Sequence, residues 1–168
     1  MIFITVGTQL PFDRLNQAVD HWAGEHPGTE VIAQIGPSHY HPSHIKSVDF
    51  VTPDVADRYF REAELIISHA GMGSIITALK YHKPLLMLPR RADFGEHRND
   101  HQLATAKWLG SRSGITVADD EKDVERLLSD EMETAHEGGD LSEYAGPEFI
   151  ARLRHAIFED EDPPQTRH

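Results

Sequence analysis

Short apolar runs alternate with amphipathic segments along most of the chain. Apolar runs of the kind found in strands buried on both faces of a sheet lie at residues 2–6, 30–35, 48–51, 65–68, 85–88 and 116–117. Segments with apolar residues at helical spacing lie between them, at 13–22, 54–63, 75–81 and 100–109. This alternation predicts an α/β fold, a Rossmann-like parallel sheet with helices on both faces.

The C-terminal part of the chain has a different pattern. Residues 122–128 and 147–158 have helical spacing, whereas 131–139 and 159–168 are polar and are expected to be mobile. We expect one domain at residues 1–128, followed by an acidic extension at 129–168 that is helical near 147–158. A length of 168 residues with 39% hydrophobic content is enough for one buried core.

The composition limits the partners and the compartment. A net charge of −12, from 28 acidic and 16 basic residues, disfavours nucleic acid and direct adsorption to an anionic bilayer. The chain has no cysteine, so disulfides and thiolate chemistry are excluded. It begins with an apolar strand pattern in place of a basic leader, and no apolar run approaches the roughly 20 residues of a membrane span. A cytoplasmic location is expected.

The clearest candidate site is the turn His69-Ala70-Gly71-Met72-Gly73-Ser74 between an expected strand and an expected helix. Two glycines let a ligand approach the backbone, and we expect Ser74 to cap the following helix. Such a turn offers N–H groups and a helix N-terminus to a phosphate or diphosphate. The alternative is that the glycines only form the turn and that His69 is a hydrogen-bonded structural histidine.

Two further loops end at the same edge of the expected sheet. Because the carboxyl ends of parallel strands meet at one edge, residues 7–9 and 89–102 should lie near this turn and form a crevice for a nucleotide sugar. Gln34 and Gly36 end another strand there and are weaker candidates. Arg90, Arg91 and Arg98 flank the crevice and face a phosphate, a partner or solvent.

Several of these motifs are also compatible with other functions. Ile76 stands where a dinucleotide fingerprint has its third glycine, which disfavours an NAD site. Asn99 and Gln102 have the spacing of a helix capping box, an alternative to ligand binding. The histidines at 39, 41 and 44 resemble a metal cluster at first sight, but Pro42 and the lack of a paired carboxylate favour a solvated loop. The Asp-x-Asp triplet at 160–162 lies in the acidic tail and is interpreted as a solvated charge run, so we expect no metal and no cofactor.

Three segments together carry a family resemblance: MIFITVGTQLPFDRL at 1–15, ISHAGMGSIITALKYHKPLLMLPR at 67–90 and GEHRNDHQLATAKWL at 95–109. They resemble the carboxyl-terminal, donor-binding domain of GT-B glycosyltransferases of family 28. The resemblance covers about residues 1–128. It is closest to small, separately encoded catalytic subunits of the Alg13-like and PssE-like exopolysaccharide glycosyltransferase group.

The resemblance implies a UDP-sugar donor and assigns roles to particular residues. It implies that the diphosphate binds at the turn 69–74, and Gly7 and Thr8 are added because their loop faces the same crevice. The expected diphosphate-binding residues are Gly7, Thr8, His69, Gly71, Met72, Gly73 and Ser74. The resemblance implies a ribose contact at the position of Thr77 and donor-sugar contacts by His101 and Gln102. From their positions in the chain, Gln34 and Gly36 are further candidates for the nucleoside or ribose, and Asn99 for the donor sugar. Many relatives place a glutamate at the position of Thr77, and a hydroxyl makes a weaker, neutral hydrogen bond to ribose than a carboxylate does. This departure favours the bacterial exopolysaccharide branch.

The resemblance also implies a second component. A complete GT-B enzyme has another domain that binds the acceptor and usually supplies the general base, and no residue of this chain suggests itself as that base. We therefore expect an Alg14-like or PssD-like membrane-associated partner, a lipid-linked saccharide acceptor, inverting transfer, and a peripheral position at the cytoplasmic face of the membrane. The alternatives are a nucleotide-sugar epimerase of related fold and a non-catalytic, nucleotide-binding scaffolding subunit.

Overall fold

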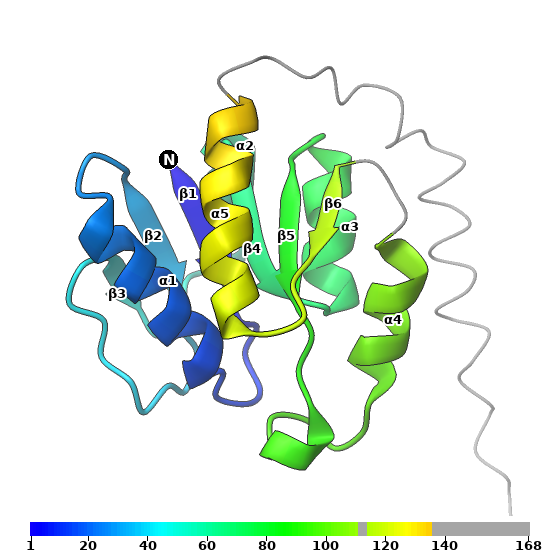
Figure 1. The fold of residues 1–168 in the computed structure, drawn as a ribbon. Helices are drawn as coiled ribbons and strands as arrows, with labels where there is room; N and C mark the ends of the chain where they lie inside the picture. The colour runs from blue at the N-terminus through cyan, green and yellow to red at the C-terminus, as the bar shows by residue number, and fades with distance from the viewer. Residues whose placement is uncertain (111–113, 136–168) are drawn as a thin grey trace, which may run out of the picture.

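The computed structural model describes residues 1–110 and 114–135, which form one parallel sheet flanked by helices (Figure 1). The strands are β1 (Ile2–Thr5), β2 (Val31–Gln34), β3 (Lys46–Val48), β4 (Leu65–His69), β5 (Leu85–Leu88) and β6 (Ile115–Val117). The helices are α1 (Asp13–Glu25), α2 (Pro53–Glu62), α3 (Met72–Lys80), α4 (His101–Leu109) and α5 (Glu121–Ala135), with a 3-10 turn η1 at Ala92–Phe94. The strand order is β3-β2-β1-β4-β5-β6, and every pairing is parallel.

Alternate residues of the central strands supply two hydrophobic cores. Ile2 and Ile4 of β1 pack with α1 and α5 on one face, whereas Phe3 packs with α2, α3 and α4 on the other. Figure 1 shows α1 and α5 side by side over the near face of the sheet. The side chains of β1, β4 and β5 are almost fully buried because helices cover both faces, which explains why these strands read as continuous apolar runs.

The chain reverses its direction of winding at β1. It moves outward from β1 to β2 and β3, then returns to the other side of β1 to form β4, β5 and β6. The loops after β1 and β4 therefore diverge at the carboxyl edge of the sheet, where doubly wound folds bind their ligands. The predicted α/β, Rossmann-like fold class is confirmed.

Several element boundaries differ from those expected, and α1 extends to Glu25 where the sequence predicted an end at 22. The third strand covers 46–48 instead of 48–51, because this exposed edge strand lacks an apolar pattern. The helix after β4 begins at residue 72 instead of 75, and α5 extends through 131–135, which were expected to be mobile. The limit expected at residue 128 falls inside α5.

Several expectations lie outside the described residues: the mobile segments at 136–139 and 159–168, the helix at 147–158 and the acidic triplet at 160–162. Among the helices that the structure describes, none is both long and apolar enough to cross a membrane.

Candidate functional site

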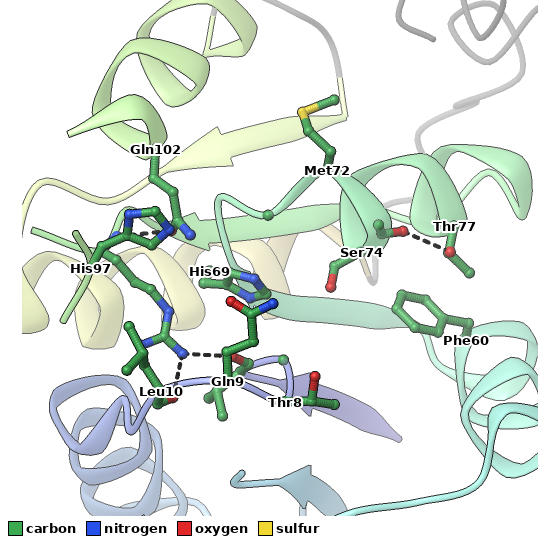
Figure 2. A pocket seen from close by; sticks show the side chains of 15 residues that line it. Thr8, Gln9, Leu10, Phe60, His69, Met72, Ser74, Thr77, His97 and Gln102 are labelled. Carbon is green, nitrogen blue, oxygen red and sulfur yellow. Dashed lines mark hydrogen bonds between the residues drawn. The ribbon is translucent and has the colours of Figure 1, made fainter. Parts of the chain in front are cut away.

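The loops that follow β1, β4 and β5 enclose a pocket of about 590 Å³ at the carboxyl edge of the sheet (Figure 2). Its volume lies in the range of small-molecule sites. It is lined by Val6, Gly7, Thr8, Gln9, Leu10, Phe60, His69, Gly71, Met72, Gly73, Ser74, Thr77, Arg90, His97 and Gln102. All the residues expected to bind a diphosphate are therefore in one place.

The N-terminus of α3 opens into this pocket. The first hydrogen bond of the helix runs from the N–H of Ile75 to the carbonyl of Gly71 (3.2 Å), so the N–H groups of Met72, Gly73 and Ser74 precede it. The cap is Gly71, and no side chain caps the helix. The expectation that Ser74 is the cap is wrong, because the helix begins earlier and Ser74 lies in its first turn. The uncapped N–H groups form an anion-binding surface.

The imidazole of His69, at the end of β4, lies between the turns after β1 and β4 (Figure 2). A Cβ on Gly71 would lie 2.0 Å from His69 Nε2, and a Cβ on Gly7 would lie 3.0 Å from His69 Cε1. Gly7 also has a φ of +77°, which favours glycine. The two glycines are therefore required by the histidine ring as well as by a ligand that approaches the backbone.

Burial, reinforced by the positive charge of Arg90, lowers the pKa of His69 from 6.5 to about 4. The ring is therefore neutral at neutral pH. It can hydrogen-bond to a ligand, but it adds no full positive charge to the site.

This shift predicts an acid-sensitive contribution to stability. The stability that comes from neutral His69 is fully present above pH 6.5 and is lost as the pH falls to about 4, because the unfolded chain takes up the proton first. The free energy of unfolding should decrease across this window by about 3 kcal/mol more than in a His69→Asn variant. Urea unfolding of both proteins between pH 4 and pH 8 measures the difference, since the other histidines are shared. Parallel curves would contradict the prediction.

Arg90, which follows β5, is only 3% exposed and is enclosed by backbone carbonyls. Its Nη2 donates to Val6 O (2.7 Å) and Leu10 O (2.8 Å), and its Nη1 donates to Pro11 O (2.6 Å) and Glu96 O (3.1 Å). Burial lowers the pKa of Arg90 to about 10, so the guanidinium remains charged at neutral pH. Arg90 therefore joins the loops after β1 and β5 and places a positive charge beside the pocket.

The charge of the pocket lining is opposite to that of the whole chain. The sequence carries a net charge of −12, yet the lining drawn from the described residues contains Arg90, two histidines and no carboxylate. The N-terminus of α3 adds partial positive charge on the same side. The pocket is therefore suited to a small anion.

The third wall comes from the segment between β5 and α4. Gln102 is 8% exposed and lines the pocket, and its Oε1 accepts the N–H of Arg90 (3.1 Å). Its amide NH₂ group is therefore the part that can donate to a ligand. His97 lines the same wall, and Figure 2 shows it beside Gln102.

Asn99 and His101, which were expected beside Gln102, are exposed and do not line the pocket. The Oδ1 of Asn99 accepts the N–H of His101 (3.2 Å). The capping-box alternative is wrong for Gln102, because α4 is capped at Asp100 and the glutamine is only its second residue.

Thr77 lies on α3, and Figure 2 shows Phe60 opposite its side chain. The Thr77 hydroxyl donates to Gly73 O (2.8 Å), so its oxygen can only accept further hydrogen bonds. It is therefore able to accept from a sugar hydroxyl, but not to donate to one.

Gln34 and Gly36 do not line the pocket and instead support the turn after β1 from behind. Gln34 Nε2 donates to Gly7 O (3.5 Å), and a Cβ on Gly36 would lie 3.1 Å from the same oxygen. Both residues were expected to contact the ligand, but they contact the backbone of Gly7, which itself lines the pocket.

Sequence reasoning missed some of the lining residues and left others unassigned. Phe60 is buried in α2 and gives the same signal as any core aromatic residue. His97 lies in a polar loop without regular spacing. Of the three arginines that flank the crevice, only Arg90 lines it, whereas Arg91 pairs with Asp93 (2.7 Å).

The histidine-rich loop between β2 and β3 is held by its backbone. The carboxylate of Asp20 accepts the N–H groups of Ser43 and His44 (2.7–3.1 Å). Within 1–110 and 114–135, no group of three or more histidine or carboxylate side chains is arranged to hold a metal ion.

One family model matches most of the chain: the model described as the glycosyltransferase family 28 C-terminal domain matches residues 1–143. A search of curated proteins found no match.

Three solved structures with a similar fold are all glycosyltransferases. The glycotransferase of kitacinnamycin has a TM-score of 0.56 and 19% identity over 94% of this chain and 38% of its own. MurG from Acinetobacter baumannii has a TM-score of 0.55 and 18% identity over 94% of this chain and 48% of its own. A UDP-glucose:anthocyanidin 3-O-glucosyltransferase in complex with UDP has a TM-score of 0.50 and 13% identity over 94% of this chain and 40% of its own. The chain thus spans less than half the length of these proteins, and the likeness is one of fold.

Proposed function

The chain belongs to the glycosyltransferase family 28 C-terminal domain family, and from this premise we propose that it is the donor-binding part of a glycosyltransferase, with UDP of a UDP-sugar held in the pocket of Figure 2. One observation carries the proposal. The uncapped N-terminus of α3 opens into a pocket whose described lining has no carboxylate, in a chain of net charge −12. A nucleoside diphosphate is the small anion that suits this site and this family.

The diphosphate binds over the first turn of α3, where the N–H groups of Met72, Gly73 and Ser74 point to its oxygens. When the sugar is transferred, negative charge grows on the β-phosphate of the departing UDP. N–H groups that are already oriented, together with the charge of Arg90, stabilise that charge without reorganisation. The attack is expected to be a direct displacement with inversion.

The ribose and the sugar bind on opposite sides of the diphosphate. Thr77 accepts a hydrogen bond from a ribose hydroxyl, in place of the glutamate that many relatives have. Gln102 donates its NH₂ group to a sugar hydroxyl, and His97 contacts the sugar from the same wall. His97 thus takes the position that the sequence suggested for His101.

We further propose that the acceptor binds to a second component, which carries the general base. The family resemblance supports an Alg14-like, membrane-associated partner and a lipid-linked saccharide acceptor, which would place the chain at the cytoplasmic face of the membrane. Transfer assays with and without such a partner test this proposal. Binding of UDP without partner-dependent transfer would favour the scaffolding alternative.

Donor binding is tested by introducing one negative charge at two exposed glycines. Gly73 and Gly28 are both exposed, and a Cβ at either has no atom within 4 Å. An aspartate at 73 lies in the first turn of α3, where it suits the helix but repels a diphosphate. Isothermal titration with UDP should show a loss of affinity of about 100-fold for Gly73→Asp and little change for Gly28→Asp. Equal affinities of both variants for UDP would contradict the donor site.

A further inference from the structure

Arginine and phenylalanine side chains alternate where the loop after β1 meets the loop after β5. The guanidinium of Arg90 lies 4.6 Å from the ring centroid of Phe12, and that of Arg14 lies 5.5 Å from the same ring. Arg14 also lies 5.2 Å from the ring of Phe94, and Arg91 lies 4.5 Å from that ring. Residues of α1 and its preceding loop are therefore interleaved with residues of the loop after β5.

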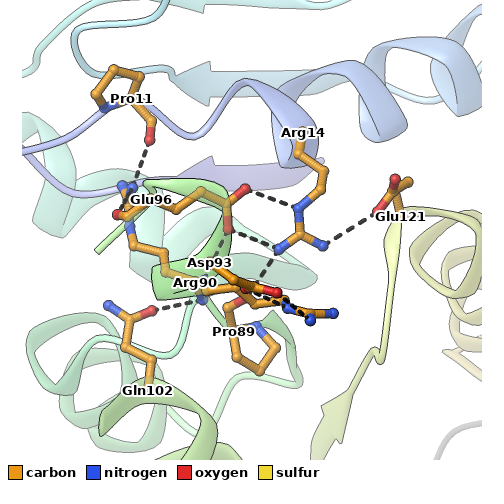
Figure 3. Close-up of polar contacts among 9 residues, drawn as sticks. Pro11, Arg14, Pro89, Arg90, Asp93, Glu96, Gln102 and Glu121 are labelled. Atoms are coloured by element: carbon orange, nitrogen blue, oxygen red, sulfur yellow. Dashed lines mark hydrogen bonds and ion pairs between the residues drawn. The ribbon is translucent and has the colours of Figure 1, made fainter. Parts of the chain in front are cut away.

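An ion pair among these alternating side chains joins α1 to the loop after β5 (Figure 3). Arg14 Nε donates to Glu96 Oε1 (2.9 Å) and Arg14 Nη2 donates to Glu96 Oε2 (2.9 Å), a bidentate pair whose side chains are 13% and 11% exposed. Arg14 Nη2 also donates to Pro89 O (3.2 Å), and Glu96 Oε2 accepts the N–H of Arg91 (3.0 Å). Neither Arg14 nor Glu96 lines the pocket.

The ion pair is the attachment of the 91–99 segment to α1. The backbone of Glu96 is also tied to the loop before α1, because Arg90 Nη1 donates both to Glu96 O (3.1 Å) and to Pro11 O (2.6 Å). Other hydrogen bonds that the structure describes for this segment are local, such as Ala92 N–H to Asp100 Oδ1 (3.0 Å) and Gly95 N–H to Ala92 O (3.0 Å). His97 follows Glu96 directly. The ion pair fixes the side chain of the residue next to His97, so a change in the pair is expected to shift His97 relative to the N-terminus of α3.

From this geometry we infer that Arg14 and Glu96 are positioning residues for the donor sugar: they hold the loop after β5 so that His97 and Gln102 face the sugar. The inference rests on the proposed function, in which UDP itself is held by α3 and the turn after β1. Loosening the ion pair should therefore weaken contacts to the sugar while contacts to UDP remain. A merely structural role would change the affinities for UDP and for a UDP-sugar together.

The test is the ratio of two affinities, measured by isothermal titration. The probes are UDP and whichever of UDP-glucose, UDP-galactose, UDP-N-acetylglucosamine and UDP-glucuronate binds most tightly to the unchanged protein. Glu96→Gln removes one of the two carboxylate acceptors, and Arg14→Lys keeps the charge but loses the bidentate contact. Glu30→Gln is the control, since it removes the carboxylate of an exposed ion pair with Lys46 (2.6 Å) just before β2, at the opposite edge of the sheet.

For Glu96→Gln and Arg14→Lys, the affinity for the UDP-sugar should fall about fivefold to tenfold relative to that for UDP, the size of one lost hydrogen bond. The control should keep the original ratio. An unchanged ratio in both variants, or a parallel loss of both affinities, would overturn the inference and leave the proposed function standing. Failure of the unchanged protein to bind any of the UDP-sugars would overturn both. If Glu96→Gln does not fold, as judged by thermal unfolding, the milder Arg14→Lys variant decides the outcome.

Discussion

Replacement of Arg90 by methionine is expected to lower the free energy of unfolding by about 3–5 kcal/mol and to abolish measurable UDP binding. The guanidinium donates to four carbonyl oxygens, and methionine supplies no donor to any of them. The carbonyls of Val6 and Leu10 would then lie in the interior without these partners. Since these carbonyls belong to the loop that lines the pocket, the site should lose its shape even in molecules that remain folded.

Urea unfolding and UDP titration of Arg90→Met measure the two effects. Arg126→Met is a matched control, because Arg126 is 61% exposed and its ion pairs with Asp123 and Asp130 lie on the surface of α5. Exposed pairs contribute about 0–1 kcal/mol, so the control should change stability little. Arg90→Lys keeps the charge but has fewer donors in a different geometry. Its stability and UDP affinity should lie between those of Arg90→Met and Arg126→Met. If Arg90→Met has the unfolding midpoint and the UDP affinity of the unchanged protein, the assigned role of Arg90 is wrong.

The second large effect is expected from one methyl group at Gly71. The Cβ of Gly71→Ala would lie 2.0 Å from His69 Nε2, so the imidazole has to move. Gly7 confines the other side of the ring, which leaves displacement of the turn after β1 or movement into the pocket. Either change damages the proposed diphosphate site. We expect a loss of UDP affinity of about 100-fold, which corresponds to about 2.7 kcal/mol, because the displaced ring or turn blocks or misaligns the diphosphate position.

The clash is tested most directly in a double variant. Gly71 has an ordinary extended backbone, with φ of −92° and ψ of 133°, so alanine causes no backbone strain there. Gly71→Ala should therefore affect UDP binding far less in a His69→Ala background than in the unchanged protein. Gly28→Ala is the control for the substitution itself, since its Cβ has no atom within 4 Å. An equal effect of Gly71→Ala in both backgrounds would show that the histidine ring is not the cause.

The sheet and the position of the site were predictable because strands that are buried on both faces appear in the sequence as continuous apolar runs. The apolar run at 85–88 coincides with β5. The runs expected for the strands on either side of it each differ from the observed strands by one residue. Once the strands are parallel, their carboxyl ends meet, so the clustering of residues 7–9, 69–74 and 102 follows from chain order. The edge strand β3 was displaced because its residues are exposed on both sides and carry no alternation.

The parts that were not predictable depend on side-chain direction and on buried charge. The start of α3 was misplaced because Ser74 has the chemistry of a cap, whereas the actual cap, Gly71, has no side chain to reveal it. An arginine in a loop is usually exposed, so the sequence gives no sign that Arg90 is buried. Only the fold shows that backbone carbonyls enclose its guanidinium. Which histidine lines the pocket depends on where α4 begins. His97 precedes the helix and lines the pocket, whereas His101 lies on its exposed face, and residue spacing alone does not distinguish the two.

The contrast between the acidic chain and its carboxylate-free pocket also bears on selectivity. At physiological ionic strength a charge is felt over roughly 8 Å, so an approaching molecule meets the field of nearby surface before that of the pocket. A long polyanion such as RNA presents many phosphates to a molecule of net charge −12 and is repelled along its whole length. A free nucleoside diphosphate presents only two, and it is small enough to leave the repulsive surface and reach the α3 N-terminus. If the proposed site binds a nucleoside diphosphate, size and total charge therefore distinguish it from longer ligands that share the same phosphate chemistry.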